Sequence, residues 1–271
     1  MLDLRLRDVP LVFLDLETTG LDLYGEDRIC EVGLQRVANG LVEAELDSLV
    51  DPQRPLNAHA FGVNRIDPEQ LASAPRFGDL ADALVGAFAG AAVVAHNAPF
   101  DVGFLQSELE RVGRAPLASP VLDTLALARR LLPRRRSYSL AALAVDLGAP
   151  PPTHRAMADV LALRVVFDHL VGLLEPFGVA TLGETLRFAR GFAPGESEPT
   201  LPPVMEDALR HGRLLRIVYD SLSSSEPTER VVRPLELTSE RGIFYLRAYC
   251  YLRNDLRAFA IKKILQAEVL S

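Results

Sequence analysis

Three strand-like runs open this chain, and they constrain its fold more than any other feature of the sequence. Residues 11–16 (LVFLDL) form a continuous apolar run, which is typical of a buried strand. Residues 29–37 (ICEVGLQRV) and 41–50 (LVEAELDSLV) have the patterns of two further strands. The Asn39–Gly40 pair between them is a hairpin signal. The chain is therefore predicted to begin with an antiparallel meander.

Helical patterns and one more short strand follow the meander. Residues 91–95 (AAVVA) indicate a buried strand, and Pro99 suits the first turn of a helix that stops before Gly113. The alternation predicts an α/β domain over residues 1–175, with a mixed sheet flanked by helices. The helices that we expect are 78–89, 99–112, 123–132, 139–147 and 155–173.

The composition changes after residue 175. Residues 176–204 are expected to form a linker rich in Pro, Gly and Glu, with a short helix over 182–190 that a capping box of Thr181 and Glu184 begins. Residues 205–271 are expected to form a small, mostly β domain behind a short helix. Its four strand-like runs are 213–219, 229–238, 243–252 and 257–269.

Composition limits the class of protein. The chain has 271 residues, of which 49% are hydrophobic, so it is globular rather than disordered. No apolar run reaches the ~18 residues that a membrane span needs, and the first residues lack the pattern of a signal peptide. We therefore expect a cytoplasmic protein with no membrane partner. Cys30 and Cys250 are too few for a disulfide framework or a zinc site and are expected to be buried thiols.

Two carboxylates mark the end of the first strand. Asp15 and Glu17 are two residues apart, so their side chains point to the same face of the strand. Such a pair is most often solvated, but on one face of a buried strand its members repel each other unless a cation lies between them.

Three further residues have ordinary explanations when each is taken alone. Asp101 lies in the first turn of a helix, where the helix dipole favours an acid. Asp159 lies within the 155–173 helix, and His154 precedes that helix in a loop. Together with Asp15 and Glu17 they suit metal-assisted phosphodiester hydrolysis. Carboxylate oxygens select Mg²⁺ or Mn²⁺, two such ions can clamp a phosphodiester, and a neutral His can accept the proton of the attacking water.

The segments around these residues resemble a known family. VFLDLETTGL, HNAPFDVGFL (96–105) and HRAMADVLA (154–162) are similar, in order and spacing, to the three motifs of the DEDDh 3′→5′ exonucleases. VLDTLALAR (121–129) resembles the segment between the second and third motifs. The resemblance covers about residues 10–172 and is closest to the epsilon-type proofreading subunits of bacterial DNA polymerase III. It implies an RNase H-like fold.

The resemblance also implies a role for each site residue. Asp15, Glu17, Asp101 and Asp159 would bind two divalent metal ions, and His154 would be the general base. The 3′-terminal nucleotide would lie against Thr18, Thr19, Gly20 and Leu21, with Leu21 beside the last base and Asn97 near the scissile end. The family often has His-Gly-Ile-Thr where this chain has Phe61-Gly62-Val63-Asn64, so Phe61 would stack on a base without supplying a polar contact.

Positive charge is unevenly distributed. The net charge is −7, yet residues 205–271 carry two more basic than acidic side chains. The Arg-rich segment 129–136 (RRLLPRRR) is either a solvated loop or a contact for backbone phosphates.

The C-terminal region resembles a WYL domain, a small Sm-like β-barrel. Its matching residues include Ile217, Tyr219, the Arg233–Pro234 pair, Phe244, Ala248 and Phe259. In a strand over 243–252, Phe244, Leu246, Ala248, Cys250 and Leu252 would share a core face, and Tyr245, Arg247, Tyr249 and Tyr251 the other. A face of Tyr and Arg suits base stacking and phosphate pairing. We predict that Arg233, Tyr245, Arg247, Tyr249 and Arg257 bind single-stranded nucleic acid.

We therefore expect an exonuclease that removes nucleotides from single-stranded or frayed 3′ ends of DNA in repair or proofreading. Two alternatives stay open: a 3′→5′ exoribonuclease, and a regulator whose WYL domain senses nucleic acid or a ligand while the nuclease fold is a scaffold. The choice between Mg²⁺ and Mn²⁺, association with a replicase and the oligomeric state are also open.

Overall fold

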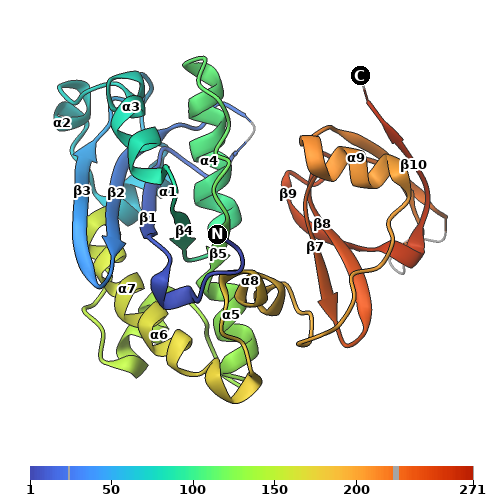
Figure 1. Cartoon of the computed structure of the whole chain (residues 1–271). Coiled ribbons are helices and arrows are strands. Elements are labelled where there is room, and N and C mark those ends of the chain that lie inside the picture. The colour runs from blue at the N-terminus through green and yellow to red at the C-terminus, as the bar shows by residue number, and fades with distance from the viewer. Residues whose placement is uncertain (24, 222–225, 271) are drawn as a thin grey trace. The chain divides into compact units, whose positions relative to one another are not determined.

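The chain forms two compact units. The computed structural model describes residues 1–23, 25–221 and 226–270, and the units are Met1–Ala189 and Arg190–Ser271 (Figure 1). Each unit has its own hydrophobic core.

The first unit is built on a mixed five-stranded sheet with the order β3-β2-β1-β4-β5. Strands β1, β2 and β3 pair antiparallel, and β4 and β5 continue the sheet in parallel with β1. This arrangement confirms the predicted meander and the RNase H-like fold class. The strands are β1 Leu11–Thr18, β2 Ile29–Ala38, β3 Leu41–Leu49, β4 Ala92–Ala95 and β5 Val121–Asp123.

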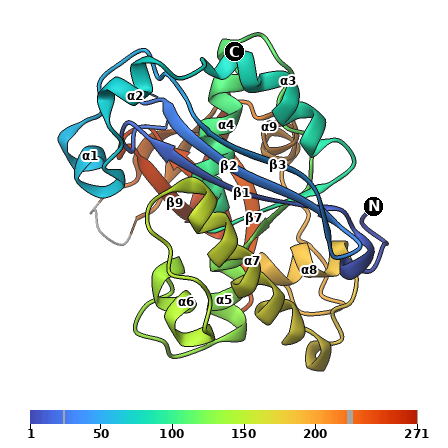
Figure 2. The same ribbon diagram turned by 90° about the vertical axis from the view of Figure 1, so that its left-hand side faces the viewer.

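Helices cover both faces of this sheet. The core on one face contains residues of α3 and α4, and the core on the other contains residues of α5 to α8; in Figure 2, α4 passes behind the strands and α7 lies on the viewer's side. Alternate residues of β1 serve the two cores: Phe13 packs with the helices on one side and Leu14 with those on the other. The helices are α1 Ala58–Asn64, α2 Pro68–Ala72, α3 Phe77–Phe88, α4 Ala98–Arg111, α5 Thr124–Leu131, α6 Leu140–Leu147, α7 Ala156–Gly172 and α8 Leu182–Ala189, with 3₁₀ turns at Leu6–Asp8 and Glu175–Phe177.

Helix α8 corresponds to the short helix that was predicted within the linker over residues 176–204. The expected capping box is present, because Glu184 Oε2 accepts from Thr181 N at 2.9 Å and Thr181 Oγ1 accepts from Glu184 N at 3.2 Å. Leu182 and Phe188 are buried in the core that α5, α6 and α7 share. The helix therefore belongs to the first unit.

The second unit is a five-stranded antiparallel sheet with the order β10-β6-β7-β8-β9. Met205 and Ala208 of helix α9 pack on its core with Ile217 and Leu246. The strand expected over 257–269 is in fact two strands, separated by the 3₁₀ turn Ile261–Lys263. The elements are α9 Pro203–His211, β6 Leu215–Tyr219, β7 Thr228–Glu240, β8 Ile243–Cys250, β9 Asp255–Ala260 and β10 Ile264–Val269.

Residues just after the division between the units are fixed to the second sheet. Ser239 N of β7 donates to Arg190 O at 2.8 Å. The Phe192 ring is fully buried and stacks on Phe244 with 6.0 Å between ring centroids. Gly191 has φ +100°, and a Cβ there would lie 1.7 Å from Ser239 O, so only glycine fits. The expected linker thus contributes to the second unit as well.

Two smaller expectations can be compared with the described residues. Cys30 and Cys250 are both buried free thiols, as predicted. In the described ranges no helix combines the length and the apolar character that a membrane span requires.

Candidate active site

The four acids that the sequence singled out come from three elements. Asp15 and Glu17 lie near the end of β1, whereas Asp101 lies in the first turn of α4 and Asp159 in the first turn of α7. Strand β1 is the centre of the sheet and contacts both helices, so the fold brings the acids together.

Burial and mutual repulsion raise the pKa values of these acids. Burial is the main cause of the raised pKa of Asp15, and the charges of Asp101, Asp159 and Glu17 add to it. Burial, then the charges of Asp159 and Glu31, raise the pKa of Glu17 to about 8. Burial likewise raises the pKa of Asp101 to about 8 and raises that of Asp159. Such a cluster favours either protons or bound cations.

Backbone N–H groups hold two of the carboxylates in place. Asp101 is 4% exposed, and its Oδ1 accepts from Leu16 N on β1 at 3.1 Å. Asp159 is 7% exposed, and its Oδ1 accepts from Thr153 N at 2.8 Å. The first bond joins α4 to β1, and the second joins α7 to the loop that precedes it.

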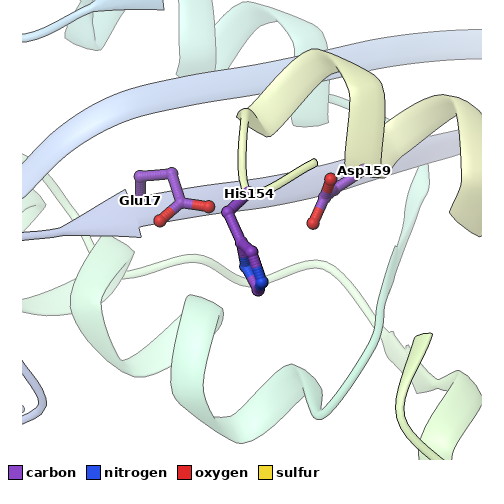
Figure 3. Close-up of side chains that lie close together, drawn as sticks. All are labelled: Glu17, His154 and Asp159. Carbon is purple, nitrogen blue, oxygen red and sulfur yellow. The ribbon is translucent and has the colours of Figure 1, made fainter. Parts of the chain in front are cut away.

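His154 completes the cluster from that loop. Ligand atoms of Glu17, His154 and Asp159 lie within 4.8 Å of one another. Figure 3 shows His154 beside Glu17 of β1 and Asp159 of α7. His154 is exposed and has φ +56°, which is a left-handed conformation that is uncommon outside glycine. The loop therefore presents the imidazole to solvent next to the carboxylates.

An ion pair that the sequence reasoning missed fixes this loop. The Glu31 carboxylate is almost fully buried on β2, in register with Glu17 of β1. It accepts from Arg155 Nη2 at 2.8 Å and Nε at 3.0 Å, and from Ala156 N at 3.1 Å. Arg155 follows His154 directly and is the N-cap residue of α7. The available signal was an acid inside an apolar strand, because such a charge is rarely buried without a partner.

Gly33 and Asn64 also shape the surroundings of the acids. A Cβ at Gly33 would lie 2.4 Å from the backbone carbon of Ala156, so glycine allows the start of α7 to touch β2. Gly33 pairs with Asp15 in the sheet, so this contact lies beside the acids. The buried amide of Asn64 lowers the pKa of Glu17 somewhat, against the larger effects that raise it. Neither role was predicted from the sequence.

The donor set fits divalent metal ions. Asp15, Glu17, Asp101 and Asp159 supply hard carboxylate oxygens, which Mg²⁺ and Mn²⁺ prefer over softer ligands. Their raised pKa values show that their negative charge is poorly balanced by the surrounding protein. A bound cation would provide this balance, and it would polarise a phosphoryl oxygen and lower the pKa of bound water.

The expected nucleotide loop lies at the end of β1. Thr19 is fully buried and its Oγ1 donates to Asp27 Oδ1 at 2.9 Å, so its side chain is used within the protein. A Cβ at Gly20 would lie 2.2 Å from Asp27 Oδ2. Thr18 is buried as well, and its Oγ1 donates to Gly20 O at 2.6 Å. Leu21 is 69% exposed. Leu21 is thus the most open of the side chains predicted to contact the nucleotide in this loop, and its contact with a base stays a prediction.

Phe61 and Asn97 also lie on elements near the carboxylates. Phe61 is on α1 and is 47% exposed, which suits the predicted stacking role. Asn97 is the N-cap residue of α4, with φ +63°, and its N–H donates to Asp123 Oδ1 at 3.0 Å. Asp123 Oδ1 also accepts from Leu125 N at 3.0 Å, so this carboxylate links the starts of α4 and α5.

The residues predicted to bind nucleic acid in the second unit do not form one exposed face. Tyr249 is only 4% exposed, because it is packed edge-on against Tyr251. Tyr245 is half-buried. Leu252 lies beyond the end of β8 and is exposed instead of in the core. Tyr249 and Leu252 correct the expected faces: Tyr249 lies within β8 but is covered, and the alternation ends before Leu252 because the strand ends at Cys250.

The three arginines of that set have protein partners. Arg247 pairs with Glu236 at 2.8 Å and Arg257 with Asp255 at 3.2 Å. Arg233 Nε donates to Tyr251 Oη at 3.4 Å. Their binding role stays a prediction.

Comparisons with known proteins agree with this geometry. The sequence model of the Exonuclease (RNase_T) family matches residues 12–167, and that of the WYL domain matches residues 202–269. A PolC-type DNA polymerase III of Thermotoga petrophila is 33% identical over 67% of this chain, and a DNA polymerase III subunit epsilon-like protein of Rhodobacter capsulatus is 33% identical over 78% of it. The chain of Exonuclease X in complex with 5′-overhanging duplex DNA matches with a TM-score of 0.50 and 26% identity, over 66% of this chain and 99% of that one.

The chain spans 13% of the Thermotoga polymerase and 28% of the Rhodobacter protein. The exonuclease match covers more than half of the sequence and includes the four acids and His154. DEDDh exonucleases, a group that depends on divalent metal ions, are among the similar structures, such as the nuclease domain of 3′hExo bound to rAMP, which shares the fold at 13% identity and a TM-score of 0.53. This chain therefore belongs to the Exonuclease (RNase_T) family and carries a WYL domain in its C-terminal part.

Proposed function

We propose that this exonuclease removes nucleotides from the 3′ end of single-stranded or frayed DNA. The observation that carries the proposal is the convergence of Asp15, Glu17, Asp101 and Asp159 with His154 beside the exposed Leu21. The match to the Exonuclease family supports the hydrolytic chemistry, and the motifs around the carboxylates resemble those of the DEDDh exonucleases.

The roles of the residues follow from their positions. The four carboxylates would hold two divalent ions, and these would stabilise the charge that develops on the phosphate. His154 is close to Glu17 and Asp159 and is open to solvent, so it can accept the proton of the attacking water. Leu21 packs beside the terminal base, and Phe61 stacks on a base from the side of α1.

The role of the second unit in this proposal is to hold the single strand. Its WYL domain carries Arg233, Arg247 and Arg257 on strands β7, β8 and β9. Arginine pairs with backbone phosphate without reading the sequence, so the second unit would retain long strands during successive cleavages. A stand-alone role in repair is consistent with a WYL domain following the nuclease domain, and association with a replicase is the other possibility.

An assay with end-labelled oligonucleotides tests the proposal. DNA and RNA strands that carry a label at the 3′ or the 5′ end are incubated with Mg²⁺ or Mn²⁺. We expect immediate release of the 3′ label as mononucleotide, a ladder of shortening 5′-labelled DNA, and loss of both with Asp15→Asn or His154→Ala. Asp82→Asn is the matched control, because Asp82 is an exposed acid of α3 that pairs with Arg114.

The other functions are outcomes of the same assay. Degradation of RNA in preference to DNA would identify an exoribonuclease. Tight binding of a strand without cleavage would identify a sensor. Hydrolysis that survives Asp15→Asn would contradict the proposed site.

A further inference from the structure

A basic pocket lies on the first unit, beside the nucleotide loop but outside the carboxylate cluster. Its volume is about 420 Å³, and its charged lining residues are Arg28, Arg54, Arg111 and Glu26. Glu26 and Arg28 lie just before β2, Arg54 lies in the segment that precedes α1, and Arg111 is the last residue of α4. The side chains that line the pocket thus carry three positive charges and one negative charge.

Two of the arginines are held from behind by acids. Arg28 donates to both oxygens of the Glu108 carboxylate, which is 2% exposed. Arg54 pairs with Asp27 at 3.4 Å, and the Asp27 side chain is 10% exposed. Neither acid lines the pocket. These carboxylates fix the guanidinium groups beneath the surface, so less side-chain entropy is lost when a ligand binds.

The arginines have further donor groups for an anion. Arg54 Nη1 is buried and lies 3.4 Å from Asp27 Oδ1, with which it forms an ion pair. Arg111 is exposed, and its Nη2 donates to Gly25 O at 3.1 Å. A guanidinium carries five N–H donors, so each of these side chains offers more donors than these contacts use, and a ligand with acceptor oxygens would be stabilised here.

The pocket is connected to the nucleotide loop through Asp27. The Asp27 carboxylate accepts from Thr19 Oγ1 at 2.9 Å and from Asp22 N at 3.0 Å, and it pairs with Arg54 on the pocket side. A group in the pocket would therefore touch the same network that shapes Gly20 and Leu21. This connection favours a ligand that belongs to the substrate.

We propose that this pocket binds a phosphate group of a nucleotide, at a second site distinct from the scissile phosphate. The inference rests on the proposed function, because we assign the phosphate to the backbone of the bound DNA strand, several nucleotides from its 3′ end. A free nucleoside monophosphate has the same recognition chemistry, so the experiment includes it as a separate arm.

The kinetic arm uses Arg111→Gln. It should raise KM for a long single strand about fivefold at an unchanged kcat, and it should reduce the dependence of log KM on log salt concentration by about 0.7, the value for one lost contact to a single strand. KM for a trinucleotide should stay the same. Arg28→Gln and Arg54→Gln are not used, because they would leave Glu108 and Asp27 unpaired, and Asp27 also shapes the nucleotide loop.

Two further variants make the test specific to the pocket. Glu26→Gln removes the single acid of the lining and should lower KM for the long strand, an effect opposite to that of Arg111→Gln. Arg7→Gln is the matched control, because Arg7 is an arginine of the same unit with a 70% exposed side chain and lies outside the pocket. It should behave like the wild type.

A binding arm separates this inference from the nuclease proposal. Inorganic phosphate and dTMP are titrated in EDTA while the arginine Nε–H resonances are followed by NMR. Without metal, the carboxylate cluster repels anions, so saturable shifts of the arginine resonances would show binding in the pocket. Shifts that Arg111→Gln removes would support the site even if the chain hydrolyses nothing. If Arg111→Gln weakened the binding of dTMP but left KM for the long strand unchanged, the ligand of the pocket would be a free nucleotide. Variants that match Arg7→Gln in both arms would overturn the proposal.

Discussion

At the scale of single residues, the carboxylate cluster should make the metal-free protein sensitive to pH. The pKa of Glu17 rises from 4.5 to about 8 on folding, mainly because of burial. Between these values the unfolded state binds fewer protons than the folded state, so the free energy of unfolding falls as pH rises and levels off above about 8. We expect a loss of roughly 2–4 kcal/mol over this window, discounted for the partial exposure of Glu17.

Urea denaturation in EDTA, at pH values across the window, measures this loss. Excess Mg²⁺ should remove most of it, since a bound cation favours the ionised carboxylates. Glu17→Gln should remove only the contribution of Glu17 to the slope in EDTA, because the amide does not titrate whereas Asp15 and Asp101 still do. A metal-free protein whose stability rises through the window would show that the carboxylates are already balanced by protein charges.

The Glu31–Arg155 pair should act on catalysis through His154. Arg155→Ala frees the loop that carries His154 and leaves Glu31 buried and unpaired, so kcat should fall tenfold or more at a similar KM. Arg155→Lys should recover part of kcat because it keeps the charge. Arg164→Ala is a matched control: Arg164 also lies on α7 and also contacts β2, donating to Gln35 Oε1 at 2.5 Å.

Stability and rate together decide this prediction. Arg164→Ala should lower the unfolding free energy without lowering kcat, whereas Arg155→Ala should lower both. Equal kcat values for the two variants at saturating substrate would show that the Glu31–Arg155 pair has only a structural role.

The residues of the site differ in how far the sequence could predict them. Each of the four acids and His154 has an ordinary explanation when it is taken alone, and their order and spacing in three motifs predicted them together as a site. Glu31 and Arg155 meet across a separation of 124 residues, and a single sequence carries no record of that contact. Tyr249 was misjudged for a related reason, since alternation along a strand does not tell which face neighbouring side chains cover.

At the scale of elements, the contact between α7 and β2 controls the geometry of the site. A Cβ at Gly33 would lie 2.4 Å from the backbone of Ala156. Gly33→Ala should therefore push α7 outward, lower the unfolding free energy by about 1–3 kcal/mol and reduce kcat, because His154 and Asp159 flank Ala156. Chemical denaturation and steady-state kinetics measure the two effects.

Gly86→Ala provides the matched control for this substitution. Gly86 lies within α3, and a Cβ there would meet no atom within 4 Å. The change should be neutral or raise the unfolding free energy by up to about 1 kcal/mol, with kcat unchanged. If Gly33→Ala behaved in the same way, the close approach of α7 would not constrain the site.

Elements were easier to predict than their boundaries and partners. The apolar run of β1 and the capping box of α8 are local signals, and the structure confirms them. The 3₁₀ turn Ile261–Lys263 divides a segment that has strand-like composition throughout. Residues 190–192 resemble a linker in composition, but contacts with Ser239 and Phe244 order them. Such contacts depend on the tertiary fold, which composition does not reveal.

At the scale of the whole molecule, the division between the units suggests how to separate their functions. A chain that ends at Ala189 keeps Leu182 and Phe188, which complete the core of the first unit. A chain that ends at residue 204 would instead retain Phe192 without Phe244, its stacking partner, and so expose a ring that is fully buried. The truncation at Ala189 is therefore the better test.

We expect the 1–189 chain to fold and to cleave short single strands with a kcat close to that of the full chain, because the acids and His154 all lie in the first unit. Its KM on long strands should rise about tenfold and its processive runs should shorten, since the phosphate contacts of the WYL domain are lost. The difference should shrink as salt concentration rises, because salt weakens those contacts in the full chain. A full chain and a truncated chain with equal KM on long strands at every salt concentration would exclude substrate retention as the role of the second unit.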